Sequence, residues 1–200
     1  TLGADLAAVI DQTLPSPVVV VGQSWGGNVV LELAAVRPDL VSGVALVDGG
    51  FLRLADDFAG WRVAAEALAP PSFGGLMFEE LAPMARSRLA DFPRSAVAAH
   101  LANFEATADG VARARLRRDH HMTILRYLWE HDPDVIGGAV RAPILVLAVD
   151  QDRTSKRQRV NAFSTASNAE VVWLNGPHDI HAQQPQVVAG ALLDFVQVVE

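Results

Sequence analysis

Residues Val18–Asn28 have the sequence VVVVGQSWGGN, which carries the strongest structural signal of the chain. Its four uninterrupted valines are β-branched and apolar, which predicts a strand covered on both faces. Gly22, Ser24 and Gly26 then match the pattern G-x-S-x-G, which is typical of a tight turn from a strand into a helix. Residues two before and two after the serine crowd each other in such a strained turn, so both should be nearly free of side chain. The pattern predicts a serine hydroxyl exposed at the carboxyl end of a sheet.

The turn also places Ser24 above the N-terminus of the following helix, where free N–H groups and partial positive charge favour a developing oxyanion. The N–H of Trp25 is the donor that this geometry predicts. A glycine-rich turn carrying an incidental serine is the alternative. A phosphate-binding turn fits less well, because no G-x-G-x-x-G pattern is present and no lysine follows the glycines.

Four apolar runs predict the strands of one sheet, with helical periodicity between them. The first two predicted strands are close together in the sequence and are joined by one predicted helix. This order predicts that the two strands pair in parallel, with a right-handed crossover. Leu2 to Ile10 and Pro185 to Val199 carry apolar residues at helical spacing and predict the first and last helices. The runs are residues 18–21, 44–47, 142–149 and 171–174. The predicted class is α/β, a parallel sheet flanked by helices.

The segment 51–140 differs in texture, being rich in Ala, Leu and Arg and broken by prolines. It predicts helices near 52–69, 76–89, 94–108 and 116–130, and no strand is evident in it. We therefore expect residues 1–50 and 141–200 to form the core and residues 51–140 to form a helical lid. Because the insertion follows the second strand on the side of the serine, it would exclude water and shape a pocket.

A nucleophilic serine needs a base, and the base needs an acid that orients it. His178 and His181 are the histidines that lie in a loop directly after a predicted core strand, and the turn Asn175–Pro177 would bring His178 back over the sheet. We expect His178 to be the base and His181 to support the loop or line the pocket. The candidate acids, in order of preference, are Asp152, Asp150 and Asp48, each just after a strand.

Composition excludes several other kinds of protein. The chain has 200 residues, a net charge of −7 and no cysteine. The acidic balance argues against nucleic acid or an anionic membrane as a partner, and the lack of cysteine excludes a disulfide or a thiolate metal site. No apolar run approaches a membrane span, and no signal-peptide pattern is present, which together predict a cytoplasmic protein. Adjacent His120 and His121 lack a convincing set of further metal ligands, so we expect no metal and no cofactor.

Three motifs together resemble the α/β-hydrolase superfamily. Gly22–Gly27 looks like its nucleophile elbow, Pro143–Asp152 resembles its seventh strand and acid loop, and Gly176–His181 followed by Pro185 resembles its catalytic-histidine loop and final helix. The resemblance implies a Ser24, Asp152, His178 triad and a lid inserted after the sixth strand. The chain is similar to the branches of the superfamily with a serine nucleophile, which are the esterases, lactonases and carbon–carbon hydrolases. Dehalogenases and epoxide hydrolases instead carry Asp at the position of Ser24.

One departure from the family pattern concerns the start of the chain. The family has four strands before the elbow strand, and the loop after its third strand supplies a second oxyanion donor, whereas only 21 residues precede Gly22 here. We expect the N-terminal half of the fold to be absent from these residues, which would expose the valine strand as a sheet edge. A missing N-terminal segment or a second copy in a homodimer would pair with that edge.

The sequence thus predicts a serine hydrolase that cleaves an ester, thioester, lactone or carbon–carbon bond in a small-molecule substrate. The expected path is an acyl-enzyme on Ser24, formed and hydrolysed with His178 as base and Asp152 as its acid. The alternatives are a non-catalytic ligand-binding member of the same fold or an inactive fragment. Cofactor-free oxidative or lyase chemistry on the same triad is a further alternative.

Overall fold

The computed structural model describes residues 1–15, 17–71, 74–150 and 154–199, which include every residue of the site discussed below except Asp152. The chain folds into two compact units, one made of Thr1–Arg53 with His131–Glu200 and the other of Leu54–Glu130. The second unit lies within the segment predicted as a helical lid, although residues 51–53 and 131–140 belong to the first unit. That the second unit covers the serine stays a prediction.

The first unit alternates helices and strands along the chain. Its strands are β1 Val18–Gln23, β2 Val41–Val47, β5 Ile144–Asp150 and β6 Glu170–Asn175. Its helices are α1 Leu2–Thr13, α2 Trp25–Val36, α8 Pro133–Ala139, α9 Thr154–Ser167, α10 Ile180–Gln183 and α11 Pro185–Val199. Each predicted core strand is therefore present, and the first and last helices cover the expected residues.

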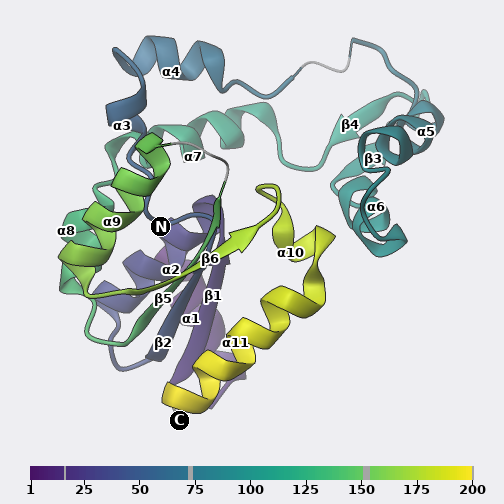
Figure 1. Ribbon diagram of the computed structural model, residues 1–200. Coiled ribbons are helices and arrows are strands. Elements are labelled where there is room, and N and C mark those ends of the chain that lie inside the picture. The colour runs from purple at the N-terminus through teal and green to yellow at the C-terminus, as the bar shows by residue number, and fades with distance from the viewer. Residues whose placement is uncertain (16, 72–73, 151–153, 200) are drawn as a thin grey trace. The chain divides into compact units, whose positions relative to one another are not determined.

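The four strands form one parallel sheet in the order β1-β2-β5-β6 (Figure 1). The register sets Val21 opposite Ala45, and Leu46 opposite Val146. Parallel strands in register end at the same edge of the sheet, so the residues directly after β1, β2 and β6 lie at that edge, beside the last residue of β5. This edge carries the candidate site, as expected for ligands of an open α/β sheet.

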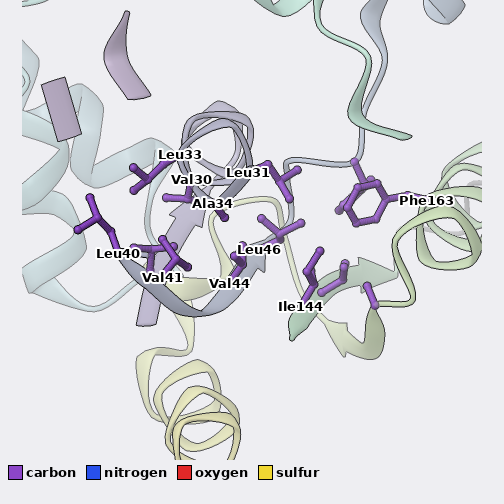
Figure 2. Close-up of a cluster of buried hydrophobic side chains, with 14 of the residues drawn as sticks. Val30, Leu31, Leu33, Ala34, Leu40, Val41, Val44, Leu46, Ile144 and Phe163 are labelled. Carbon is purple, nitrogen blue, oxygen red and sulfur yellow. The ribbon is translucent and has the colours of Figure 1, made fainter. Parts of the chain in front are cut away.

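Helices cover both faces of the sheet and bury its apolar side chains. One face packs against α1, α2, α8 and α9, and Figure 2 shows how Leu31 and Phe163 project from the helices toward Val44, Leu46 and Ile144 of the strands. The opposite face packs against α10 and α11 through a second cluster. Because β2 and β5 are covered on both sides, their runs Val44–Val47 and Ile144–Val149 are apolar throughout rather than alternating.

The second unit contains helices and, contrary to the sequence-based expectation, a small sheet. Its helices are α3 Leu54–Asp57, α4 Trp61–Ala67, α5 Phe78–Arg88, α6 Arg94–Leu101 and α7 Arg118–Glu130. The predicted helix 94–108 ends at Leu101, and the antiparallel strands β3 Phe104–Ala106 and β4 Ala112–Ala114 follow it. Gly110, with a φ of +79°, permits the turn between them, a conformation that glycine adopts at little cost.

Strand β1 lies at one end of the strand order, with β2 as its one strand partner among the residues that the structure describes. Its Val21 is 49% exposed, as expected for an apolar strand at a sheet edge. What pairs with this edge stays a prediction. Within the described ranges, the structure contains no helix that is both long and apolar enough to cross a membrane.

Candidate active site

The serine of the G-x-S-x-G pattern lies where β1 turns into α2. Ser24 has a φ of +52°, a left-handed conformation that a side chain adopts only under strain. A Cβ added at Gly22 would lie 2.3 Å from the carbonyl oxygen of Gly26, so the requirement for glycine at position 22 is confirmed. The crowding is one-sided, because a Cβ at Gly26 would meet no described atom within 4 Å beyond its chain neighbours and the backbone of its own helix. The expectation that both glycines relieve crowding is therefore wrong for Gly26.

His178 lies in the loop between β6 and α10 and reaches the serine. Its Nε2 is 3.0 Å from Ser24 Oγ, so the hydroxyl can donate to the imidazole. The side chain is 46% exposed, which leaves the reacting edge of the ring accessible. The structure thus brings together the two residues that the sequence proposed as nucleophile and base, although they are 154 positions apart.

The acid beside His178 is Asp48, directly after β2. The Nδ1–H of His178 donates to Asp48 Oδ2 across 2.7 Å. Asp48 Oδ1 accepts the backbone N–H of Val149 at 3.0 Å and lies 2.5 Å from the ammonium nitrogen of Lys156. The carboxylate is only 2% exposed, and both of its oxygens have partners.

This arrangement differs from the order of preference among the acids. Asp152, the first choice, lies outside the described residues. Asp150, the second choice, is at the end of β5 and pairs with Arg157. Asp48, ranked third, is the carboxylate hydrogen-bonded to His178.

The sequence held a signal for Asp48 in the glycine that follows it. A Cβ at Gly49 would lie 2.0 Å from the carbonyl oxygen of Ser24, so only glycine lets the end of β2 pack against the elbow. That close approach carries the preceding Asp48 to the imidazole.

Hydrogen bonding and charge raise the pKa of His178 and lower the pKa of Asp48. The hydrogen bond to Asp48 raises the pKa of His178 above its ordinary value, against the opposing effect of burial. Burial works to raise the pKa of Asp48, but hydrogen bonds from His178 and Lys156 outweigh it and hold that pKa below its usual range. At neutral pH Asp48 is therefore ionised and able to stabilise an imidazolium.

Two further groups flank the serine. The Gln23 side-chain amide lies 3.3 Å from His178 Nε2 and 3.5 Å from the His178 carbonyl oxygen. Trp25 is the first residue of α2, and the first N–H groups of a helix have no acceptor within the helix. The N–H of Trp25 thus stays our predicted oxyanion donor. Among the described residues, no group of three or more His, Cys, Asp or Glu side chains could hold a metal ion.

Comparison with known proteins places the chain in a family. The model of the alpha/beta hydrolase family matches residues 2–191, nearly the whole sequence. The chain therefore belongs to the alpha/beta hydrolase family, as the three sequence motifs indicated. Among curated proteins, Lipase LipV of Mycobacterium tuberculosis is 54% identical over 43 residues. That match spans 22% of this chain and 16% of the lipase, so the chain covers only a small part of that relative.

Solved structures share the fold at low sequence identity. E-2-(acetamidomethylene)succinate hydrolase superposes with a TM-score of 0.74 at 19% identity, over 98% of this chain and 72% of its own. An esterase from M. tuberculosis gives a TM-score of 0.70 at 20% identity, over 98% and 68%. The thioesterase domain from the curacin biosynthetic pathway gives 0.68 at 18% identity, over 96% and 70%. These likenesses establish the alpha/beta hydrolase fold.

Proposed function

We propose that the protein is a serine hydrolase in which Ser24, His178 and Asp48 form the catalytic triad. The observation that carries the proposal is one unbroken row of hydrogen bonds, 3.0 Å from Ser24 Oγ to His178 Nε2 and 2.7 Å from His178 Nδ1 to Asp48 Oδ2. Nucleophile, base and orienting acid within hydrogen-bond reach are the geometric signature of covalent acyl transfer. The lipase, esterase and thioesterase among the similar proteins support the same class of reaction.

In the proposed first half-reaction, Ser24 Oγ bonds to the carbonyl carbon of the substrate while its proton passes to His178 Nε2. The resulting oxyanion accepts a hydrogen bond from the N–H of Trp25, above the N-terminus of α2. The carbonyl re-forms as the bond to the leaving group breaks, and the imidazolium gives its proton to that group. Asp48 holds the Nδ1–H tautomer and stabilises the imidazolium throughout.

In the second half-reaction, water attacks the acyl-enzyme. His178 takes a proton from the water, the new bond forms at the acyl carbon, and the bond to Ser24 Oγ breaks as that oxygen recovers a proton from the imidazolium. The acid product and the free serine result. Esters, thioesters and lactones are the substrates that this path accommodates, and a carbon–carbon bond beside an activated ketone is the remaining class.

A fluorophosphonate probe and a p-nitrophenyl ester test the proposal together. The protein should label stoichiometrically at Ser24 and hydrolyse the ester, and Ser24→Ala should lose both properties. Ser167→Ala is the matched control, because the hydroxyl of Ser167 bonds the carbonyl of Phe163 within α9. Undiminished turnover by Ser24→Ala would overturn the assignment. An absence of labelling in the folded protein would instead favour the ligand-binding alternative.

A further inference from the structure

Lys156 is the one lysine of the sequence, which also contains fifteen arginines. It lies in the first turn of α9, and its side chain is only 12% exposed. Its ammonium nitrogen is 2.5 Å from Asp48 Oδ1. The chain thus uses its single lysine against the carboxylate of the proposed triad.

The two oxygens of Asp48 serve different partners. Oδ1 receives Lys156 and the N–H of Val149, whereas Oδ2 receives His178. A buried carboxylate is costly unless it is paired and hydrogen-bonded, and a neutral imidazole offers no compensating charge. Lys156 supplies that charge while leaving Oδ2 to the histidine.

The chemistry of the two basic side chains explains why a lysine fits here. An ammonium is a compact point charge that can bind one carboxylate oxygen, whereas a guanidinium is a planar fork that tends to bind both. Arg37, for example, contacts both oxygens of Asp39 and both of Asp11. A fork of this kind at position 156 would compete with His178 for Oδ2.

We infer that Lys156 is a positioning residue of the proposed reaction: its ammonium fixes Asp48 Oδ1 so that Oδ2 stays directed at His178 Nδ1, and its charge offsets part of the carboxylate's pull on the imidazole. The catalytic meaning of this inference rests on the proposed function. The contact between Lys156 and Asp48 and its effect on the pKa of His178 do not depend on that function, because both can be measured without a substrate.

The charged groups that face His178 give the direction of the effect. The hydrogen bond to Asp48 raises the pKa of His178 and burial lowers it, while the charge of Asp179 raises it and that of Lys156 lowers it. Ser24 and Gln23, the other side chains within hydrogen-bond distance of the imidazole among the described residues, are neutral. Removing the charge at position 156 should therefore raise the pKa of His178 further. It should also raise the pKa of Asp48, which loses a donor.

The absence of cysteine from the sequence permits a controlled test. Lys156→Met removes the charge and keeps most of the volume. Lys156→Cys provides a unique thiol that 2-bromoethylamine converts into a near-isostere of lysine, which restores the ammonium. Arg157→Met is the matched control, because this neighbouring side chain pairs with Asp150 at the surface and not with Asp48. The pKa of His178 is followed by NMR of its imidazole Cε1–H, assigned with His178→Gln.

We expect Lys156→Met to raise the pKa of His178, and with it the acid limb of kcat/KM, by about half a pH unit or more. Lys156→Cys should behave in the same way, its aminoethylated form should return to the wild-type value, and Arg157→Met should leave the value unchanged. A pKa of His178 that does not move when the charge is removed would overturn the inference. So would an aminoethylated protein that still resembles Lys156→Met.

A measurement on the wild-type protein guards against a variant that fails to fold. Protein grown with ¹³Cε-lysine gives a single lysine signal, because Lys156 is the one lysine. That signal should show an inflection at the pH where His178 titrates, and the inflection should vanish in His178→Gln. A signal without this inflection would contradict the inference. Fluorophosphonate labelling of Ser24 is scored separately, so a failure of the proposed function is distinguishable from a failure here.

Discussion

The adjacent parallel strands β2 and β5 each bring an aspartate to the carboxyl edge of the sheet, but the two carboxylates have different surroundings. Asp48 is 2% exposed and bonded to His178, Lys156 and the N–H of Val149. The carboxylate of Asp150 is 32% exposed and pairs with Arg157 at the surface. A position at the sheet edge is therefore not sufficient for an orienting acid, whose carboxylate must also be buried and directed at the base.

The largest expected effect separates the two strand ends by activity. Asp48→Asn should lower kcat/KM about 10⁴-fold, because the amide cannot hold His178 in the required tautomer. Asp150→Asn and Asp152→Asn should each stay within about threefold of wild type, because Asp48 already accepts the hydrogen bond from His178 Nδ1. Steady-state hydrolysis of a p-nitrophenyl ester measures all three. A large loss in Asp152→Asn with little loss in Asp48→Asn would reverse the comparison.

The next effect tests how tightly the end of β2 is packed against the elbow. Gly49→Ala should destabilise the protein by about 3 kcal/mol or more, since the new methyl group would collide with the backbone of Ser24. Gly190→Ala is the matched control in α11, where a Cβ meets nothing within 4 Å, and should stabilise by about 0.5–1 kcal/mol. Urea unfolding gives both values. Equal effects of the two substitutions would mean that the end of β2 is not crowded.

The pH dependence of the free energy of unfolding should distinguish Asp48, at the end of β2, from Asp150, at the end of β5. The pKa of His178 is raised in the folded state, chiefly by the hydrogen bond to Asp48. The stabilisation from this pair is therefore complete below the ordinary histidine pKa of 6.5 and is lost as the pH rises through the folded value.

Urea unfolding between pH 5.5 and pH 8.5 measures this loss as a decline in the free energy of unfolding. His178→Gln should remove that decline, whereas Asp150→Asn should keep it.

At low pH, Asp48 acts in the opposite direction. Its pKa is lowered, so its contribution to stability is present above the ordinary aspartate pKa and is lost as the pH falls through the folded value. A wild-type protein whose stability is flat through the histidine range would contradict the pairing.

The smallest expected effect concerns the surface pair at the end of β5. Arg157→Met removes the ion pair with Asp150 and the cation–π contact with Trp173, in which the guanidinium carbon is 4.7 Å from the ring centroid. Exposed contacts of this kind contribute about 1 kcal/mol or less. Urea unfolding of the variant and the wild type should detect that change in stability. The kcat for ester hydrolysis should stay unaltered. A fall in kcat would indicate that the end of β5 reaches the reacting groups after all.

Local pattern was enough to predict the fold and two members of the site. Four apolar runs gave the strands, because strands buried on both faces are apolar throughout. The elbow glycine at position 22 and the turn before His178 indicated Ser24 and His178, since both lie in short motifs directly after strands, and the structure places the two side chains within hydrogen-bond distance.

The acid was harder to predict because its selection depends on distant contacts. Three aspartates follow predicted strands, and the one local signal that separates them is the glycine directly after Asp48, whose meaning depends on the folded chain. The choice of Asp48 depends on the close packing of Gly49 against Ser24 and on Lys156, which is 108 positions away in the sequence. The small sheet of β3 and β4 was missed for a related reason: three-residue strands are too short for an alternating pattern to stand out.

Proton NMR of the imidazole Nδ1–H of His178 reports whether Asp48 is the carboxylate that accepts its hydrogen bond. A hydrogen bond to a carboxylate slows solvent exchange of this proton and shifts it downfield. We expect a protected downfield resonance in the wild type that persists in Asp150→Asn and Asp152→Asn and is lost in Asp48→Asn. A resonance that survives Asp48→Asn and disappears in Asp152→Asn would rule out Asp48 as the acceptor.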